Sequence, residues 1–264
     1  MTTRPLETVY EETRTRVVGL IRDPGGDVAA SAAAVAVPAC PSWSVRDVLA
    51  HVTGLYSDIV SGNIGGAATD AWTAAQVEAR RSMTIDELLA ESDEVGPKLA
   101  AMIDDFPGRY GAQVVADLAV HEHDIRGALG RPGARRSGAV AVGTEFLLGA
   151  VVGPGAAALG VGPVEVRSGE GCWTVGTGES ASGEPEAAIA AAIAATAASA
   201  EVEPAAGPEP VGEISADPFE LFRAFTGRRS AAQIRRFGWT VDPEPYLALF
   251  DLWPFTIRET DLVE

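Results

Sequence analysis

The chain has 264 residues, of which 47% are hydrophobic and 22% are charged, so it is expected to fold as a globular protein rather than to stay disordered. Its 37 acidic residues exceed its 20 basic residues, and the formal net charge of -17 repels phosphate backbones and anionic lipid. Nucleic acid is therefore not an expected partner. This length suits one large domain or two modest ones, and we expect two.

The sequence predicts neither an export signal nor a membrane span. Acidic residues occur near the N-terminus, where a signal peptide would have its apolar core. The apolar stretch 139–152 is shorter than the ~20 residues that a spanning helix needs, and 187–200 is nearly all alanine. Because a chain of this size with only Cys40 and Cys172 needs no disulfides, a reducing cytoplasm is the expected location.

Four segments in the first 130 residues have the periodicity of amphipathic helices. Ser44 is a candidate N-cap of the second, and Thr84 opens the third with a capping box. Gly96-Pro97 is expected to kink the third helix, and Gly130 to end the fourth. The expected helices cover residues 5–21, 45–59, 85–102 and 109–129. Four long helices with intervening loops describe a helical bundle.

After about residue 160 the pattern changes to short β-type segments. Gly169-Glu170-Gly171 joins two of them and predicts a hairpin. The expected elements are strands at 164–168, 172–177 and 211–215, an Ala-rich helix at 187–200, a loop at 201–210 and a helix from Pro218 to Gly227. The predicted fold is therefore a helical bundle over residues 1–158, followed by a smaller α+β domain over 159–264.

All three histidines of the chain fall in the helical half. His51 lies at the flank of the apolar stripe of the second helix, so it faces the interior or a cleft. In the fourth helix Asp117, His121 and Asp124 follow at i, i+4 and i+7 and form one column, whereas His123 points elsewhere.

This arrangement supports two interpretations. Asp117 and His121 on one helix, with His51 from a facing helix, provide three ligands on one side of a divalent metal and leave the other side open. Alternatively, Asp117 and His121 share an i,i+4 hydrogen bond, and His51 is a half-buried core histidine. The spacing alone leaves both open.

Three stretches of the sequence bear on this choice: 38–52, 117–130 and 217–230. The first two, with Pro41-Ser42-Trp43-Ser44 before His51 and Val120-His121 before Asp124, resemble the mycothiol-dependent maleylpyruvate isomerase family. That family belongs to the DinB-like metal-binding four-helix bundles. The third stretch resembles the sterol-carrier-like second domain of the same family.

The resemblance implies particular roles for residues of this chain. The metal ligands, for zinc by the habit of the family, would be His51, Asp117 and His121, although the family has glutamate where this chain has the shorter Asp117. Asp124 is then an outer partner of a metal ligand, or else a charge at the helix end. Cys40 has no activating neighbour in the sequence, so we expect a buried structural thiol.

Two arginines are weaker candidates. The resemblance implies an arginine before the third helix, for which Arg81 is the choice as a catalytic residue; the alternative is a solvated surface charge. Arg228 is a candidate for binding an anionic cofactor, and the alternative is that it compensates the dipole of the helix that ends at Gly227.

The sequence thus favours an enzyme in which a bound metal stabilises the thiolate of mycothiol, which then attacks a small electrophile, in an isomerisation or an S-transfer. An actinobacterial cytoplasm follows from that thiol. The chain lacks a Gly-x-Ser-x-Gly elbow and a Gly-x-Gly-x-x-Gly loop after a strand, so serine hydrolase and dinucleotide-binding functions have no support. The alternatives are a non-catalytic metal- or small-ligand-binding module and a regulatory bundle with an exposed apolar patch. The sequence does not indicate an oligomeric state.

Overall fold

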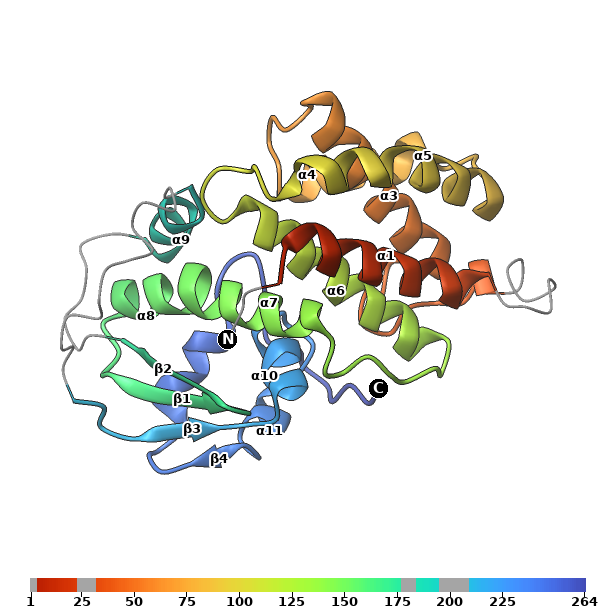
Figure 1. Ribbon diagram of the computed structural model, residues 1–264. Coiled ribbons are helices and arrows are strands. Elements are labelled where there is room, and N and C mark those ends of the chain that lie inside the picture. The colour runs from red at the N-terminus through yellow and green to blue at the C-terminus, as the bar shows by residue number, and fades with distance from the viewer. Residues whose placement is uncertain (1–3, 23–31, 177–183, 195–208) are drawn as a thin grey trace. The chain divides into compact units, whose positions relative to one another are not determined.

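The computed structural model describes residues 4–22, 32–176, 184–194 and 209–264. The chain divides into two compact units. The first comprises residues 1–105, 117–134 and 263–264, and the second comprises 106–116 and 135–262. Helices build the first unit, and the second adds a four-stranded sheet (Figure 1). A helical part followed by an α+β part is the fold class that the sequence predicts.

The first unit contains the helices that the periodicity predicts and one that it does not. The helices are α1 (Leu6–Ile21), α3 (Val45–Ser61), α4 (Asp70–Ala79), α5 (Ile85–Ile103) and, from Asp117 onward, α6 (Tyr110–Ala128). The unpredicted helix is α4. It packs against α3, which also packs against α5, and α5 packs against α1.

Helix ends in the first unit follow the predicted capping chemistry. Ser44 and Asp47 form a capping box at the start of α3, and Gly62 ends that helix with φ 77°. Thr84 and Glu87 form the box that opens α5. This helix continues without interruption through Pro97.

The cap of α1 comes from a distant residue. Pro5 precedes the helix and has no side chain that accepts a hydrogen bond. The carboxylate of Asp104, just after α5, instead accepts hydrogen bonds from the backbone N–H groups of Leu6 and Glu7 at 2.8 and 3.3 Å. This contact ties the start of α1 to the end of α5 and places a negative charge at the helix N-terminus.

In the second unit, residues 138–159 form a continuous helical stretch, which the sequence indicates only as an apolar segment. It comprises α7 (Gly138–Leu147), the π-helix η1 (Leu148–Val152) and α8 (Gly153–Leu159). At 22 residues it is longer than expected, and within the described chain it is the one stretch apolar and long enough to span a membrane. However, 67% of its most apolar window is buried inside the protein, as in a core helix.

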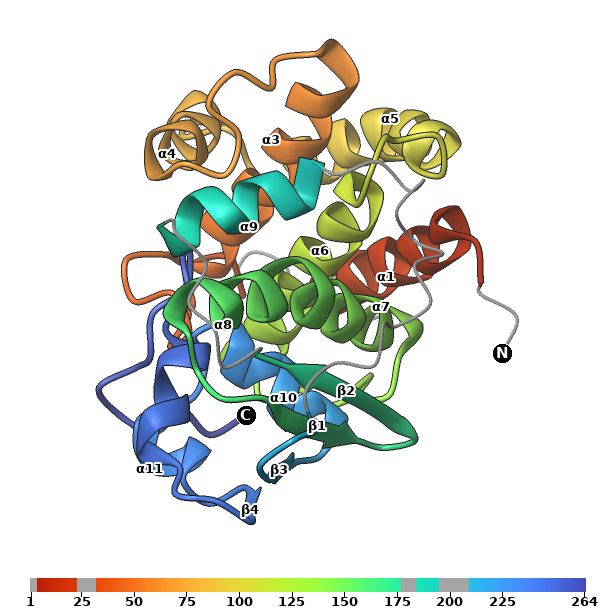
Figure 2. The same ribbon diagram turned by 90° about the vertical axis from the view of Figure 1, so that its left-hand side faces the viewer.

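The sheet has the strand order β2-β1-β3-β4 (Figure 2). The strands are β1 (Val164–Ser168), β2 (Gly171–Val175), β3 (Glu213–Ser215) and β4 (Gly238–Trp239). β1 and β2 form the predicted antiparallel hairpin, whose turn uses Gly169 at φ 59°. β3 pairs parallel with β1 and antiparallel with β4.

The second unit contains further helices besides α7, η1 and α8. They are α9 (Pro185–Ala194), α10 (Pro218–Phe225), the short α11 (Ala231–Ile234) and the 3-10 helix η3 (Glu244–Phe250). The Ala-rich helix is confirmed as far as Ala194; the predicted helix over 195–200 and nearly all of the predicted loop 201–210 lie outside the described residues. α10 is confirmed with its predicted cap, Asp217. β4, α11 and η3 were not predicted.

The predicted domain boundary at residue 158 stays a prediction. The two compact units divide the chain at other residues. They place α7, η1 and the whole of α8 with the C-terminal residues. The physical reason is packing: α7 contacts α10, and a Cβ at Gly143 of α7 would lie 2.5 Å from the ring of Phe222. α8 likewise packs against α9 and β2.

Loss of the α3 cap should destabilise the first unit. We expect Ser44→Ala to lower the free energy of unfolding by about 1 kcal/mol, because the N–H of Asp47 loses its acceptor. Urea unfolding followed by circular dichroism measures the effect. Ser42→Ala, in the exposed loop before the cap, is the matched control and should leave the midpoint unchanged; equal midpoints for both variants would contradict the role of the cap.

Candidate metal centre

The candidate metal centre lies in the first unit, between α3 and α6. His51 is on α3, and Asp117 and His121 are one turn apart on α6. The Nε2 atoms of His51 and His121 lie 3.8 and 3.7 Å from the two carboxylate oxygens of Asp117, and the three ligand atoms are all within 4.8 Å of one another. Ligand atoms of a tetrahedral zinc site are about 3.4 Å apart, since each bond is about 2.0–2.1 Å. The observed spacing is close to that value.

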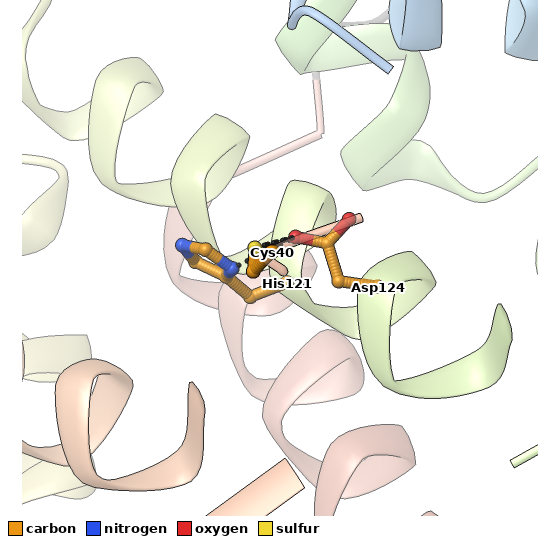
Figure 3. A group of neighbouring side chains, drawn as sticks. All are labelled: Cys40, His121 and Asp124. Atoms are coloured by element: carbon orange, nitrogen blue, oxygen red, sulfur yellow. Dashed lines mark hydrogen bonds and ion pairs between the residues drawn. The ribbon is translucent and has the colours of Figure 1, made fainter. Parts of the chain in front are cut away.

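Asp124 fixes the proton of His121. Its carboxylate, 1% exposed, lies 3.1 Å from Nδ1 of His121, and Figure 3 shows the two side chains facing each other. An ionised carboxylate only accepts hydrogen bonds, so Nδ1 donates, and Nε2 of the neutral imidazole keeps its lone pair on the side of Asp117. An outer partner of a metal ligand makes a contact of this kind, so the geometry agrees with that interpretation of Asp124.

Gln76 of α4 is the hydrogen-bond partner of His51, as Asp124 is of His121. Its Oε1 lies 2.8 Å from Nδ1 of His51, and its Nε2 donates to Asp58 Oδ2 at 2.8 Å. Like the two imidazoles, the Gln76 side chain is buried. Both histidines therefore use Nδ1 for a buried protein partner, and both direct Nε2 toward Asp117.

The loop before α3 supplies one wall of the site. Backbone hydrogen bonds from Val37 to Trp43 and from Trp43 to Cys40 close this loop tightly. The indole ring of Trp43 lies 5.3 Å from the ring of His51 and 6.1 Å from that of His121, measured between centroids. Trp43 thus lies beside the rings of both histidines.

Cys40 lies beside His121 and Asp124, as Figure 3 shows. Its Sγ is 3.4 Å from the same Asp124 oxygen that accepts from His121. The thiol is half-buried rather than fully buried as expected. Cys40, His121 and Asp124 therefore form a second group whose ligand atoms lie together.

The donor chemistry favours the group with His51 over the group with Cys40. In the Cys40 group a thiol and an N–H both donate to one carboxylate, so the contacts are favourable without a cation. In the His51 group two imidazole lone pairs and a carboxylate converge. Acceptors that converge repel one another unless a cation lies among them, so His51, Asp117 and His121 fit a divalent metal ion.

Tyr56 does not add a charged ligand to this group. It is fully buried on α3, with its ring edge-on to that of Tyr10 at 5.4 Å. Burial raises the pKa of its hydroxyl well above the usual value, and Tyr10 and the carboxylate of Asp117 raise it further. The hydroxyl therefore stays neutral.

The structure does not bring Arg81 to the site. Its side chain is 78% exposed and pairs with Glu78 on the surface of the first unit. Among the described contacts none joins its guanidinium to the three ligands, so the geometry supports the alternative of a solvated charge. The preceding residue, Arg80, is much less exposed, at 11% of its side chain, and pairs with Glu91 of α5.

Arg228 belongs to the second unit, where it lies next to the end of α10. Its Nη1 donates to the backbone carbonyl of Thr226 at 2.6 Å. This contact with the helix end is the one that the alternative interpretation of Arg228 predicts. Its neighbour Arg229 forms two hydrogen bonds with the carboxylate of Glu220.

These features define a helical protein with a candidate metal centre of two histidines and one carboxylate. Residues 19–126 match the family model described as mycothiol maleylpyruvate isomerase N-terminal domain. This match agrees with the family that the sequence resembles, and the matched part of the chain contains all three candidate ligands. No curated protein and no solved structure matches the chain.

Removal of either histidine should abolish metal binding without unfolding the protein. We expect His51→Ala and His121→Ala to lose zinc in metal analysis while keeping their helical circular dichroism, because the apolar stripes of α3 and α6 remain. His123→Ala is the control, since it also removes a buried imidazole but one outside the cluster. Unfolding of the first two variants with zinc still bound would instead support the core-histidine interpretation.

Proposed function

We propose that this protein is a metal-dependent enzyme that joins a low-molecular-weight thiol, mycothiol by its family, to a small electrophile, as an isomerase or an S-transferase. The observation that carries the proposal is the convergence of His51, Asp117 and His121 with both Nε2 atoms directed at one point. The family of residues 19–126 supports the choice of thiol.

A divalent ion held by these residues would act as a Lewis acid and lower the pKa of a coordinated thiol, so that thiolate is present at neutral pH. The protein supplies the rest. Asp124 and Gln76 hold the imidazoles in the ligating orientation. The indole of Trp43 lies beside both rings.

The proposed chemistry needs only the thiol and the electrophile. The thiolate sulfur adds to a conjugated double bond, which becomes a single bond when the S–C bond forms. Rotation about that single bond, followed by cleavage of the S–C bond, gives the isomer and returns the thiol. In a transfer reaction the S–C bond stays, the carbanion that the addition leaves takes up a proton equivalent to the one that the thiol lost, and the adduct leaves as product.

Further parts of the proposal rest on the family alone. These are zinc as the metal, a DinB-like fold for the helical part, a sterol-carrier-like fold for the C-terminal part, and an actinobacterial cytoplasm as the location. The expected partners are a small-molecule thiol and an electrophilic substrate. We propose neither nucleic acid nor membrane as a partner, in keeping with the net charge of -17.

Activity should require an added thiol and a bound metal. We expect consumption of an activated electrophile by the purified protein only when a low-molecular-weight thiol is present, and a loss of rate on chelation. Cys40→Ala and Cys172→Ala should both remain thiol-dependent, because neither cysteine is the nucleophile. Full turnover in a chelated, thiol-free preparation would contradict the proposal, and metal binding without any turnover would support the non-catalytic binding module.

The length of the acidic ligand provides a separate test. Asp117→Glu restores the side chain of the family, and we expect zinc affinity and rate to hold or rise, because the longer carboxylate can still reach an ion bound by the two Nε2 atoms. Asp117→Asn should lower zinc affinity by at least about 10-fold, since a direct ligand contributes no less than an outer partner. Competition with a chromophoric chelator measures both. Zinc affinity and rate unchanged in both variants would place Asp117 outside the set of ligands.

A further inference from the structure

We propose that Gln76 is a positioning residue of the metal centre: it fixes the proton of His51 on Nδ1 and thereby directs the Nε2 lone pair at the metal. The inference rests on the proposed function, in which His51 is a ligand. Gln76 touches neither the metal position nor the expected substrates directly; it acts through His51.

The hydrogen-bond chain determines which atom carries each proton. Asp58 is an acceptor, so the amide of Gln76 turns its NH₂ group toward Asp58, at 2.8 Å. The amide oxygen then faces His51 at 2.8 Å. Because that oxygen only accepts, Nδ1 of His51 donates, and the neutral imidazole has its lone pair on Nε2.

The fold makes specific room for Gln76. Gly54 lies one turn after His51 on α3, and a Cβ there would be 2.6 Å from Cβ and 2.9 Å from Cγ of Gln76. A side chain at position 54 would therefore displace the stem of Gln76. The absence of one lets α4 approach α3 closely enough for the amide to reach the imidazole.

A second contact fixes α4 in that position. Arg80, at the C-terminal end of α4, forms an ion pair with Glu91 of α5 and donates to the backbone carbonyl of Gln76 at 3.3 Å. The pair is largely buried, so solvent screens it less than a surface pair. Gln76 is thus held through its side chain and its backbone, and only 2% of it is exposed.

The two histidines have chemically different partners. Asp124 gives His121 a charged acceptor, whereas Gln76 gives His51 a neutral one. An amide sets the tautomer without adding a third negative charge to those of Asp117 and Asp124. It also avoids a carboxylate in contact with Asp58, where like charges would repel.

The first test measures the tautomer directly in metal-free protein. Gln76→Met keeps the approximate volume and charge of the side chain but removes the acceptor. At a pH where the imidazoles are neutral, nitrogen chemical shifts should show a single Nδ1–H tautomer of His51 in the wild type and a population of Nε2–H in the variant. The His121 signals should not change. An unchanged Nδ1–H tautomer of His51 in the variant would overturn the proposal.

The second test measures zinc affinity by chelator competition in the absence of thiol and substrate. We expect Gln76→Met to weaken binding by about 10–100-fold, the usual effect of losing an outer partner. Glu78→Gln, at an exposed position of the same helix, is the matched control and should bind as the wild type does. Equal affinities for the wild type and Gln76→Met would overturn the proposal.

Gly54→Ala tests the same contact without replacing the Gln76 side chain. Alanine is the better helix former, so α3 itself is not weakened, but the new methyl group displaces Gln76. We expect the same direction of change in tautomer and zinc affinity as in Gln76→Met, and wild-type values would count against the proposal. If the wild type bound no zinc, the proposed function would fail, whereas the tautomer of His51 would still be measurable and would decide the role of Gln76.

Discussion

The candidate metal centre depends on one kind of interaction, the hydrogen bond from each imidazole Nδ1 to a buried acceptor. Without it a neutral histidine exchanges between two tautomers, and its Nε2 is a ligand in only one of them. Asp124 and Gln76 remove that freedom for His121 and His51. The convergence on Asp117 is thus a consequence of contacts made on the far side of each ring.

Those acceptors in turn depend on how the helices pack. Asp124 follows His121 on the same helix, so the regular geometry of α6 brings them together. Gln76 comes from another helix, and its position requires the missing side chain at Gly54 and the ion pair of Arg80 with Glu91. One histidine is therefore oriented by local structure and the other by tertiary structure.

This difference explains what the sequence could and could not predict. His121 and its partners share one helix face, so spacing alone places them in a column, and His51 is found from the apolar stripe of α3. Gln76 is the one buried residue of α4, so that helix has no apolar stripe to predict it. Arg81 is exposed whereas the neighbouring Arg80 is largely buried, and a pair of adjacent arginines in a sequence gives no sign of which one faces inward. In the second unit, β4 and α11 are too short for their periodicity to be recognised.

The same packing couples metal binding to folding. His51, His121, Gln76 and Asp124 are polar groups placed where apolar side chains would stabilise more, and their hydrogen bonds to one another offset only part of the cost of removing them from water. A cation that binds the folded chain alone adds stability by mass action, about 2.7 kcal/mol at a hundredfold excess over Kd. The histidines come from α3 and α6, and Gln76 comes from α4. Metal binding would therefore stabilise the packing among these three helices. Asp124 and Gln76, which orient the metal ligands, are therefore among the buried polar residues whose cost of burial the bound ion offsets.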